Sequence, residues 1–559
     1  METDAEGIKV ALVHAAVQPK NKANNLARLL NLNEKAAREG ARIIVNPELA
    51  TSGYVFNNRF DIAPWTETIP GPTTEQFGKI SKKFGAYICI GLPEVDVKTG
   101  IFYNSAIVMG SEGSVIGKHR KIAPAFKENL WAAEGNLPPL VIPTEYGKLG
   151  VVICADAYSY KPVRVAALQG ARLLLVPVNW PADYNNPEKY WRARALENGI
   201  YVLICNRTGL ESGMDCSSGE SFIINNRGEV IEKMTSADDT IIYGILPLNK
   251  GKFISTAEDM QAQRRPHCYA NISLATFSHL SSEYLLGLPE ALDCTVATVQ
   301  YCPVRGNPEL NRSKVLDLID TGIDMAKTSG EKVDLLVFPE LSLTGIISSY
   351  QEAERLSEEI PGPTSQSFIN KAQEKDIFIV IGMAERKAGK FYNSSILISP
   401  KGIKGVYRKV HLSSHDKGWA EAGDIFPTFD LPFGRIGMLL GCELLFPEST
   451  ECLAKMGTDL LCVPSIWKDP KSQFIWEARV AEQMHLAIAN QWGDEVDSCA
   501  AGKSAIYSYA LDPDQRQIVE SSEKNNHINI MRLKIKDTRA KNFVEKIDYD
   551  ILLNLGGEV

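Results

Sequence analysis

The chain repeats itself once along its 559 residues, and this internal repeat constrains the fold more than any other feature. Short motifs of the first half return in the same order after about residue 290. The matched pairs are RIIVNPELATSG with DLLVFPELSLTG, ETIPGPT with EEIPGPT, FYNSA with FYNSS, and LLLVPVNW with LLCVPSIW. Two repeats of this size are too long and too few for a solenoid, so each half is expected to be a complete domain. We predict domains at residues 1–285 and 290–559.

Each half alternates short β-branched runs with amphipathic stretches, a pattern typical of strands that alternate with helices. Residues 8–13 (IKVALV) predict the first strand, and the leucines of residues 26–32 predict the helix that follows. The IPGPT motif, with its proline and glycine, predicts the start of another helix. FYNSAIVM and SVIGKHRK predict a hairpin. Strands that are linked both by helices and by hairpins indicate an α/β fold with mixed sheets and helices packed outside them.

Composition and charge exclude several classes of protein. The formal net charge is −8, so the chain lacks the basic surface expected of a nucleic-acid-binding protein or of one attracted to anionic membranes. The acidic N-terminal segment METDAEGIKV lacks the pattern of a signal peptide, and no apolar run approaches the length of a membrane span. Eleven cysteines without CxxC pairs and eight scattered histidines predict a reducing, cytoplasmic setting and neither a metal nor another cofactor.

Three reactive side chains of the first half follow predicted strands. They are Glu48 in NPELATSGY, Lys121 in HRKIAPAFKE and Cys154 in LGVVICAD. Taken singly, the first two are typical of solvated surface residues, and a lone cysteine is typically an inert core residue. Together they make a coherent set, because a buried carboxylate can take the proton of a thiol and an ammonium can stabilise an oxyanion.

These three motifs, followed by PVNW, RARALENGIYVLICNRTG and SGESFI, resemble the carbon–nitrogen hydrolase family, also called the nitrilase superfamily. The resemblance covers almost all of both halves. It implies an αββα sandwich in each half and a covalent thioester or thioimidate intermediate. It also implies that Glu48 is the general base, Lys121 the oxyanion stabiliser and Cys154 the nucleophile. Glu128 matches a second active-site glutamate of many members, and the backbone N–H of Ala155 matches a second oxyanion donor.

The second half keeps only part of this set. Glu340 and Lys409 match the base and the lysine, and Asp416 stands where the second glutamate is expected. The segment GRIGMLLGCELLFPES gives two answers for the nucleophile: the local motifs on both sides place Gly441 there, whereas the spacing from Lys409 points to Cys442. We favour the local count, because the motifs that give it flank the segment directly. A one-residue slip in a strand reverses a side chain, so Cys442 is expected to miss the pocket.

The second half is therefore interpreted as a degenerate domain that replaces the second subunit of a family dimer, making an internal pseudo-dimer. Further homo-oligomers of the fused chain are compatible with the resemblance.

Cys154 is followed by Ala155 and Asp156, which resembles the amidase branches and favours an amide or an N-carbamoyl compound as the substrate. A nitrile is the runner-up, because KIAPAFKE resembles the nitrilase branch.

Two aromatic residues are candidates for the pocket wall. Tyr54 and Trp180 both follow predicted strands, although an ordinary core position is an equally good interpretation of each. A non-catalytic scaffold and a metal-dependent hydrolase are the competing functions. The first is suggested by the decay of one half, and the second lacks a ligand cluster in the sequence.

Overall fold

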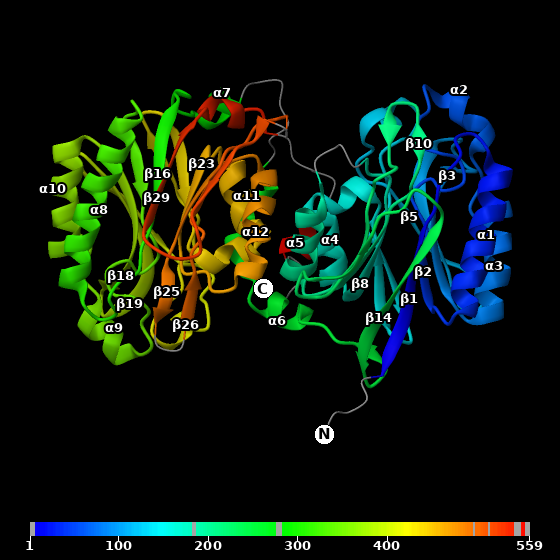
Figure 1. Ribbon diagram of the computed structural model, residues 1–559, viewed down its shortest axis with the longest axis horizontal. Helices are drawn as coiled ribbons and strands as arrows, with labels where there is room; N and C mark the ends of the chain where they lie inside the picture. The colour runs from blue at the N-terminus through cyan, green and yellow to red at the C-terminus, as the bar shows by residue number, and fades with distance from the viewer. Residues whose placement is uncertain are drawn as a thin grey trace. The chain divides into compact units, whose positions relative to one another are not determined.

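The computed structural model describes residues 6–181, 186–274, 282–495, 498–512, 515–541 and 549–553 (Figure 1). Contacts divide the chain into two units, residues 1–262 with 544–559 (unit 1) and residues 263–543 (unit 2). The division therefore comes earlier than the boundary expected between 285 and 290. The reason is that the short helix η5 (Ala270–Ser273) packs against α11 (Pro447–Lys455) of unit 2. An ion pair of 2.9 Å between Arg264 and Glu448 lies in the same unit.

Unit 1 contains two mixed β-sheets. The first runs in the spatial order β15 (Lys252–Phe253), β14 (Thr240–Asn249), β1 (Gly7–His14), β2 (Ile43–Val45), β3 (Tyr87–Val95), β4 (Phe102–Met109) and β5 (Val115–Arg120). The second runs in the order β13 (Val230–Met234), β12 (Ser221–Ile224), β9 (Tyr201–Cys205), β8 (Ala171–Pro177), β7 (Gly147–Val151) and β6 (Leu140–Thr144). The central strands β1–β2–β3 and β7–β8–β9 are parallel, and the outer pairs are antiparallel.

Helices cover the outer faces of both sheets of unit 1. In Figure 1, α1 (Lys22–Arg38) and α3 (Pro72–Phe84) lie on the first sheet, whereas α4 (Tyr160–Leu168) and α5 (Glu188–Asn198) lie on the second. The alternation of strand residues explains the layers. In β1, Val10 and Leu12 pack between the sheets, and Ala11 and Val13 pack under the helices. The result is the expected αββα sandwich.

Unit 2 repeats this architecture. Its first sheet runs in the order β20 (Gly402–Arg408), β19 (Lys390–Ser399), β18 (Phe378–Lys387), β17 (Leu335–Val337), β16 (Cys294–Gln300) and β29 (His527–Leu533). Its second runs in the order β21 (Thr428–Leu431), β22 (Gly434–Met438), β23 (Leu460–Ser465), β24 (His485–Asn490), β27 (Ala505–Tyr507) and β28 (Ile518–Glu520). Helices α8 (Pro308–Thr328) and α10 (Pro363–Lys375) cover the first sheet, and α11 and α12 (Phe474–Arg479) cover the second (Figure 1).

The repeated IPGPT motif produces the same helix in both units. Helices α3 and α10 each begin at the second proline of the motif, where the missing N–H costs nothing. They end at a residue with positive φ, Gly85 at 62° and Asp376 at 53°. The IPGPT motif therefore predicted the start of this helix in both units.

Several smaller α-helices and strands also belong to the described chain. They are α2 (Arg59–Ile62), α6 (Ala257–Ala262), α7 (Ser282–Leu286), α9 (Tyr350–Leu356), the ribbons β10–β11 (Leu210–Glu211, Met214–Asp215) and β25–β26 (Trp492–Glu495, Ser498–Ala501), and α13 (Tyr549–Leu553). Helix α13 belongs to unit 1, where it packs against α4.

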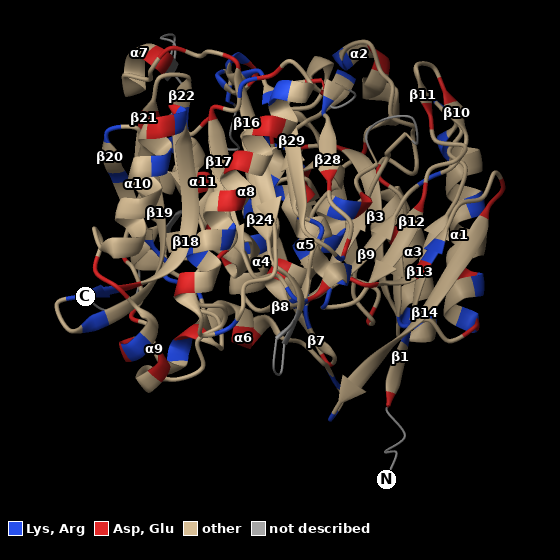
Figure 2. Cartoon of the chain, turned by 60° about the vertical axis from the view of Figure 1, so that its left-hand side comes forward, with Lys and Arg blue, Asp and Glu red and all other residues tan. Residues whose placement is uncertain are grey.

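Figure 2 shows lysines and arginines interspersed with acidic residues on helices such as α1, α3 and α8. Among the described residues, no helix has both the length and the apolar character needed to cross a membrane.

Candidate active site

The carboxylate of Glu48 lies at the end of a parallel strand, in a turn that follows β2. The side chain is fully buried. Its Oε2 accepts a hydrogen bond of 2.8 Å from the backbone N–H of Asn179, and the Asn179 amide in turn donates to the Glu48 carbonyl at 2.9 Å. Asn179 comes just after β8, so the ends of two strands from different sheets meet here. These contacts fix the position of the carboxylate between the sheets.

Lys121 follows β5 and places its ammonium between two carboxylates. Its Nζ lies 2.8 Å from Oε1 of Glu48 and 2.5 Å from Oε2 of Glu128, which belongs to the short helix η2 (Phe126–Leu130). The amide of Asn104, on β4, donates to both carboxylates, to Glu48 at 2.7 Å. All of these side chains are buried. The cluster is therefore a closed network of one cation, two carboxylates and one bridging amide.

Cys154 is the first residue of the short helix η3 (Cys154–Ala157), and its backbone has φ of 46°. This left-handed conformation is strained for a residue with a side chain and is typical of functional sites. The thiol Sγ lies 4.0 Å from the carbonyl oxygen of Asn179. The same residue therefore contacts Glu48 and Cys154, which places the thiol beside the carboxylate.

Asp156 holds the turn that carries Cys154. Its carboxylate accepts hydrogen bonds from the N–H groups of Ile153 at 3.2 Å and Ile122 at 3.0 Å, and it pairs with the ring of His119 at 2.8 Å. The side chains of Asp156 and His119 are both fully buried. Asp156 thereby ties the segment after β5, which carries Lys121, to the turn with the thiol.

Burial and the neighbouring charges set the protonation states of the cluster. Burial raises the pKa of Glu48 to about 7 against the opposing effect of Lys121, and Glu128 adds to the rise. Burial, and then the charge of Glu48, raise the pKa of Cys154 well above its usual range. Burial alone would lower the pKa of Lys121, but Glu128 and Glu48 outweigh it and keep that pKa high. Near neutral pH the site therefore holds a thiol, an ammonium and a carboxylate able to accept a proton.

The two aromatic candidates lie in different surroundings. Tyr54 is buried, donates its hydroxyl to the carbonyl of Ala125 at 3.0 Å, and places its ring centre 5.7 Å from Nζ of Lys121. Trp180 packs edge-on against Trp191 and lines a pocket of about 220 Å³ whose wall includes none of the three reactive residues. The structure therefore brings Tyr54 to the cluster, and Trp180 directly follows Asn179, the residue that contacts both Glu48 and Cys154. Ala155 lies between Cys154 and Asp156 in η3.

Unit 2 reproduces the charged cluster. Nζ of Lys409 lies 2.6 Å from Oε1 of Glu340 and 2.8 Å from Oδ2 of Asp416. The amide of Asn393 bridges the two carboxylates at 2.7 and 2.9 Å, as Asn104 does in unit 1. Ile466 stands in place of Asn179 and keeps the backbone N–H contact with the Glu340 carboxylate at 3.1 Å, and the Gln491 amide replaces the lost side-chain contact by donating to the Glu340 carbonyl at 2.7 Å. The second cluster is thus as closely bonded as the first.

Gly441 occupies the position in unit 2 that Cys154 occupies in unit 1. It is the first residue of the short helix η7 (Gly441–Leu445) and has φ of 38°. Glu443 accepts a hydrogen bond of 2.8 Å from the N–H of Leu440, as Asp156 does from Ile153. A Cβ atom built on Gly441 would lie 2.6 Å from Oε2 of Glu340. Both the backbone and the anchoring carboxylate therefore support the local register count.

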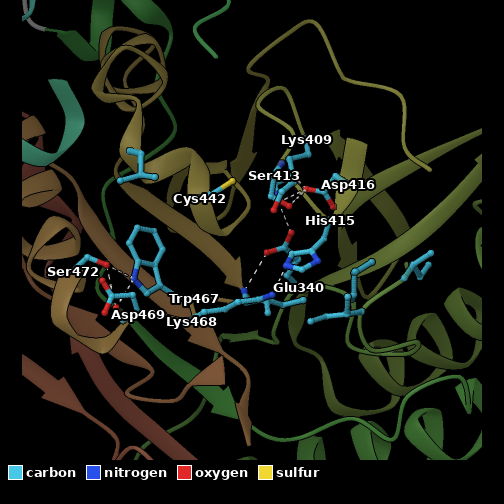
Figure 3. A pocket seen from close by; sticks show the side chains of 16 residues that line it. Glu340, Lys409, Ser413, His415, Asp416, Cys442, Trp467, Lys468, Asp469 and Ser472 are labelled. Atoms are coloured by element: carbon cyan, nitrogen blue, oxygen red, sulfur yellow. Dashed lines mark hydrogen bonds and ion pairs between the residues drawn. The ribbon is translucent and has the colours of Figure 1, made fainter. Parts of the chain in front are cut away.

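Cys442 does not lie where we expected it. Its side chain, predicted to miss the pocket, lines a pocket of about 280 Å³ together with Glu340, Lys409 and Asp416 (Figure 3). The prediction assumed a strand at this point. The chain has already left β22 and entered η7, where successive side chains turn by about a third of a circle and do not alternate between opposite faces.

Asn104, Asn179, His119 and Asp156 were assigned no role from the sequence. The recurrence of FYNS in both halves marks the position of Asn104 and Asn393, and the motifs HRKIAPAFKE, LGVVICAD and PVNW contain the other three residues. Among the residues that the structure describes, no group of three or more His, Cys, Asp or Glu side chains could hold a metal ion.

The family model described as carbon-nitrogen hydrolase matches residues 9–253 and again 295–542. A protein named nitrilase from Pyrococcus abyssi is 32% identical over 265 residues, which are 47% of this chain and 99% of that protein. An (R)-stereoselective amidase from Pseudomonas sp. is 30% identical over 271 residues, 47% of this chain and 93% of that protein.

Among solved structures, this chain matches Nit3 from Saccharomyces cerevisiae, described as a member of branch 10 of the nitrilase superfamily. It is 28% identical, with a TM-score of 0.40, and the match covers 43% of this chain and 90% of that protein. The family model covers most of both halves, so this chain belongs to the carbon-nitrogen hydrolase family, with two tandem domains of the family in one polypeptide.

Proposed function

We propose that unit 1 hydrolyses the C–N bond of a small amide or N-carbamoyl compound and releases ammonia. The observation that carries this proposal is the Lys121 ammonium held between the buried carboxylates of Glu48 and Glu128, beside a thiol in a strained turn. Membership of a family whose relatives are named as an amidase and a nitrilase supports the same class of reaction.

The geometry supports a two-step mechanism. Glu48 takes the proton of Cys154 as the sulfur attacks the carbonyl carbon of the amide. Lys121 has three N–H donors and uses two of them on carboxylates, so the third can stabilise the oxyanion together with the N–H of Ala155. Glu48 then gives the proton to the departing nitrogen, and ammonia leaves a thioester on Cys154.

The second step consumes one water molecule. Glu48 takes a proton from this water, the resulting hydroxide attacks the thioester carbon, and the C–S bond breaks. The carboxylic acid leaves, and the proton returns to the sulfur. An N-carbamoyl compound gives a carbamate in this step, which decomposes to an amine and carbon dioxide.

A nitrile is the second candidate substrate. The relative named nitrilase and the segment KIAPAFKE favour it, whereas Ala155 and Asp156 after the nucleophile favour an amide. In that reaction the sulfur would attack the nitrile carbon to form a thioimidate, and two water molecules would be consumed. We favour the amide.

Unit 2 is proposed to be inactive in this chemistry because Gly441 offers no nucleophile. The tandem arrangement favours an internal pseudo-dimer, because a tether gives the two units a high effective concentration for each other.

The direct test is ammonia release from a panel of primary amides, N-carbamoyl amines and nitriles. We expect turnover of at least one amide or N-carbamoyl compound. Turnover of nitriles alone would show that the substrate is a nitrile, the second candidate, and not an amide. Release from no member of the panel would favour a scaffold and contradict the proposal.

The dependence of the rate on pH is expected to follow the protonation of the Glu48 carboxylate. Only the carboxylate form accepts the thiol proton, and the pKa of Glu48 is raised to about 7. We therefore expect kcat/KM to rise as the pH increases through about 7 and to fall roughly tenfold per unit on the acid side. Initial rates measured from roughly pH 5 to pH 9 would show this limb. A rate that stays constant down to about pH 5 would mean that Glu48 is not the base.

A further inference from the structure

A buried carboxylate outside the ion cluster holds the turn that carries Tyr54. Glu211, on the two-stranded ribbon β10–β11, accepts hydrogen bonds from the backbone N–H of Tyr54 at 3.0 Å and of Val55 at 2.7 Å. Gly53 has φ of 84°, and a Cβ atom built there would lie 3.0 Å from Oε1 of Glu211. Glycine at this position therefore leaves room for the carboxylate, and the ribbon fixes the backbone at Tyr54.

Arg207 holds this carboxylate in turn. Its Nη1 pairs with Oε2 of Glu211 at 2.5 Å, and both side chains are buried; this ion pair is called here the Tyr54 clamp. The remaining guanidinium nitrogens donate to the carbonyls of Thr208 and Val17, each at 3.4 Å. Val17 follows β1 and Arg207 follows β9, so the clamp ties the ribbon to strand ends of both sheets. A buried ion pair adds little net stability, because taking two charges out of water is costly, so we interpret this one as a positioning device.

The ring of Tyr54 joins the ribbon to the ion cluster. Its centre lies 5.7 Å from Nζ of Lys121, and its hydroxyl donates to the carbonyl of Ala125, directly before η2. The ring also belongs to a small apolar cluster with Trp131, which follows η2, and with Met214 of the ribbon. Burial, and then the charge of a nearby glutamate, raise the pKa of Tyr54 well above its usual range, so its hydroxyl remains a donor. The ring therefore packs over the lysine with support from both neighbouring elements.

Unit 2 carries neither the tyrosine nor the arginine. Ile346 stands in place of Tyr54, and Gln491 stands in place of Arg207. The second ion cluster forms all the same, so its assembly requires neither residue. Its three charged side chains are 4%, 2% and 3% exposed, however, and Ile346 lines the pocket that opens onto them. The three charged side chains of the first cluster are all 0% exposed. The complete cover is thus found in the unit that has a nucleophile.

We propose that Arg207 and Glu211 are positioning residues of unit 1, which hold the Tyr54 ring as a cover that keeps bulk water away from the ion cluster. The kinetic consequence of this inference rests on the proposed hydrolase function, whereas the cover itself does not. Excluding water strengthens the interactions between the charges inside the site and limits the water that reaches a thioester. The clamp touches no reacting group, so its effect on the reaction must pass through Tyr54.

Water exclusion has a signature in the pH profile. Burial is the main cause that raises the pKa of Glu48 to about 7. The other titratable groups that face Glu48 are Lys121, Glu128, Cys154, Tyr54 and Cys216. All of them remain when Arg207 is replaced. Water that enters favours the carboxylate form and lowers the pKa of Glu48, so the acid limb of kcat/KM should move down by at least about half a pH unit. A variant that is merely less stable keeps its limb near pH 7.

The kinetic test uses the residues that unit 2 has at the same positions. Tyr54→Ile should lower kcat roughly tenfold to a hundredfold, and Arg207→Gln roughly threefold to tenfold, both with the shifted acid limb. Tyr54→Phe keeps the ring and should keep the limb near pH 7. In the Tyr54→Ile background, Arg207→Gln should change kcat by less than about twofold, because the residue through which it acts is gone. Arg172→Gln is the matched control: it breaks an ion pair of 3.0 Å to Glu258 elsewhere in unit 1 and should leave kcat and the limb unchanged.

Labelling of Cys154 tests the cover without turnover. Cys154 is 4% exposed, so iodoacetamide should label it slowly in the full chain, as followed by peptide mass spectrometry. Tyr54→Ile and Arg207→Gln should speed this labelling at least about threefold, because they open the site. Cys302, which is half-buried in unit 2, should be labelled at an unchanged rate. Arg207→Lys keeps a charge opposite Glu211 but loses the planar fork, so it should show a smaller effect in each assay. It takes the place of Arg207→Gln if the thermal transition shows that this variant does not fold.

Two results would overturn the proposal. One is labelling of Cys154 at the original rate in folded Arg207→Gln, together with an acid limb that stays near pH 7. The other is a full additional loss of kcat when Arg207→Gln is combined with Tyr54→Ile. If the unsubstituted chain turns over no compound of the panel, the proposed function fails, but the labelling rates still decide whether the clamp covers the site.

Discussion

Cys154→Ala is expected to lower the rate of ammonia release by at least about four orders of magnitude, because no other group at this site can form the covalent intermediate. The substitution removes a single sulfur atom, and the turn is held by Asp156 and its partners, which do not depend on the thiol. The folded state should therefore survive. Circular dichroism and the thermal transition would check this, and ammonia release on the best substrate of the panel would measure the loss.

Cys442→Ala is the matched control for this experiment. Cys442 also lines a pocket beside a lysine and a carboxylate, yet it stands one position beyond the nucleophile site. Its removal should leave the rate within about twofold of the unsubstituted chain, as a substitution away from reacting atoms does. A large loss with Cys442→Ala and none with Cys154→Ala would assign the chemistry to unit 2.

Glu48→Gln is expected to lower kcat roughly a hundredfold to ten-thousandfold, the range for removing a general base. The glutamine amide has the shape of the carboxylate, and Lys121 keeps Glu128 as a partner at 2.5 Å, so no buried charge is abandoned. The acid limb near pH 7 should disappear from the residual activity, because the group responsible for it no longer titrates. Steady-state kinetics over the same pH range would measure both effects.

Glu340→Gln makes the same change in the second cluster. Glu340 has the same bonds to a lysine and an asparagine, so any structural cost should be similar in the two variants. Ammonia release should nevertheless be unchanged within about twofold. Equal losses in the two variants would show that the effect of Glu48→Gln is structural and that Glu48 is not the base.

Much of this architecture could be predicted from local patterns. The repeat and its strand–helix alternation predicted two α/β domains with mixed sheets and outer helices, and the family resemblance implied the αββα sandwich, in which alternating residues such as Val10 and Ala11 face different layers. The register of Gly441 was also accessible, since short motifs on both sides fix a turn more closely than a distant residue does. Polar residues at strand ends predicted the cluster, because parallel strands bring their ends together.

Other features depend on tertiary contacts that no local pattern encodes. Asn104 bridges two carboxylates only because β4 lies beside the turns that carry them. Cys442 lines the pocket because the strand ends before it, and the sequence does not show where an apolar run changes into a turn. The unit boundary after residue 262 depends on packing against α11, about 180 residues farther along the chain.

The glycine at position 441 makes the loss of the nucleophile hard to reverse. Restoring a cysteine would place its Cβ 2.6 Å from a carboxylate that is already held by Lys409 and Asn393. It would also impose on a side chain the φ of 38° that glycine adopts freely, at a cost of about 1 kcal/mol or more. A working nucleophile at this turn would therefore need both a cysteine at position 441 and a different position of the Glu340 carboxylate.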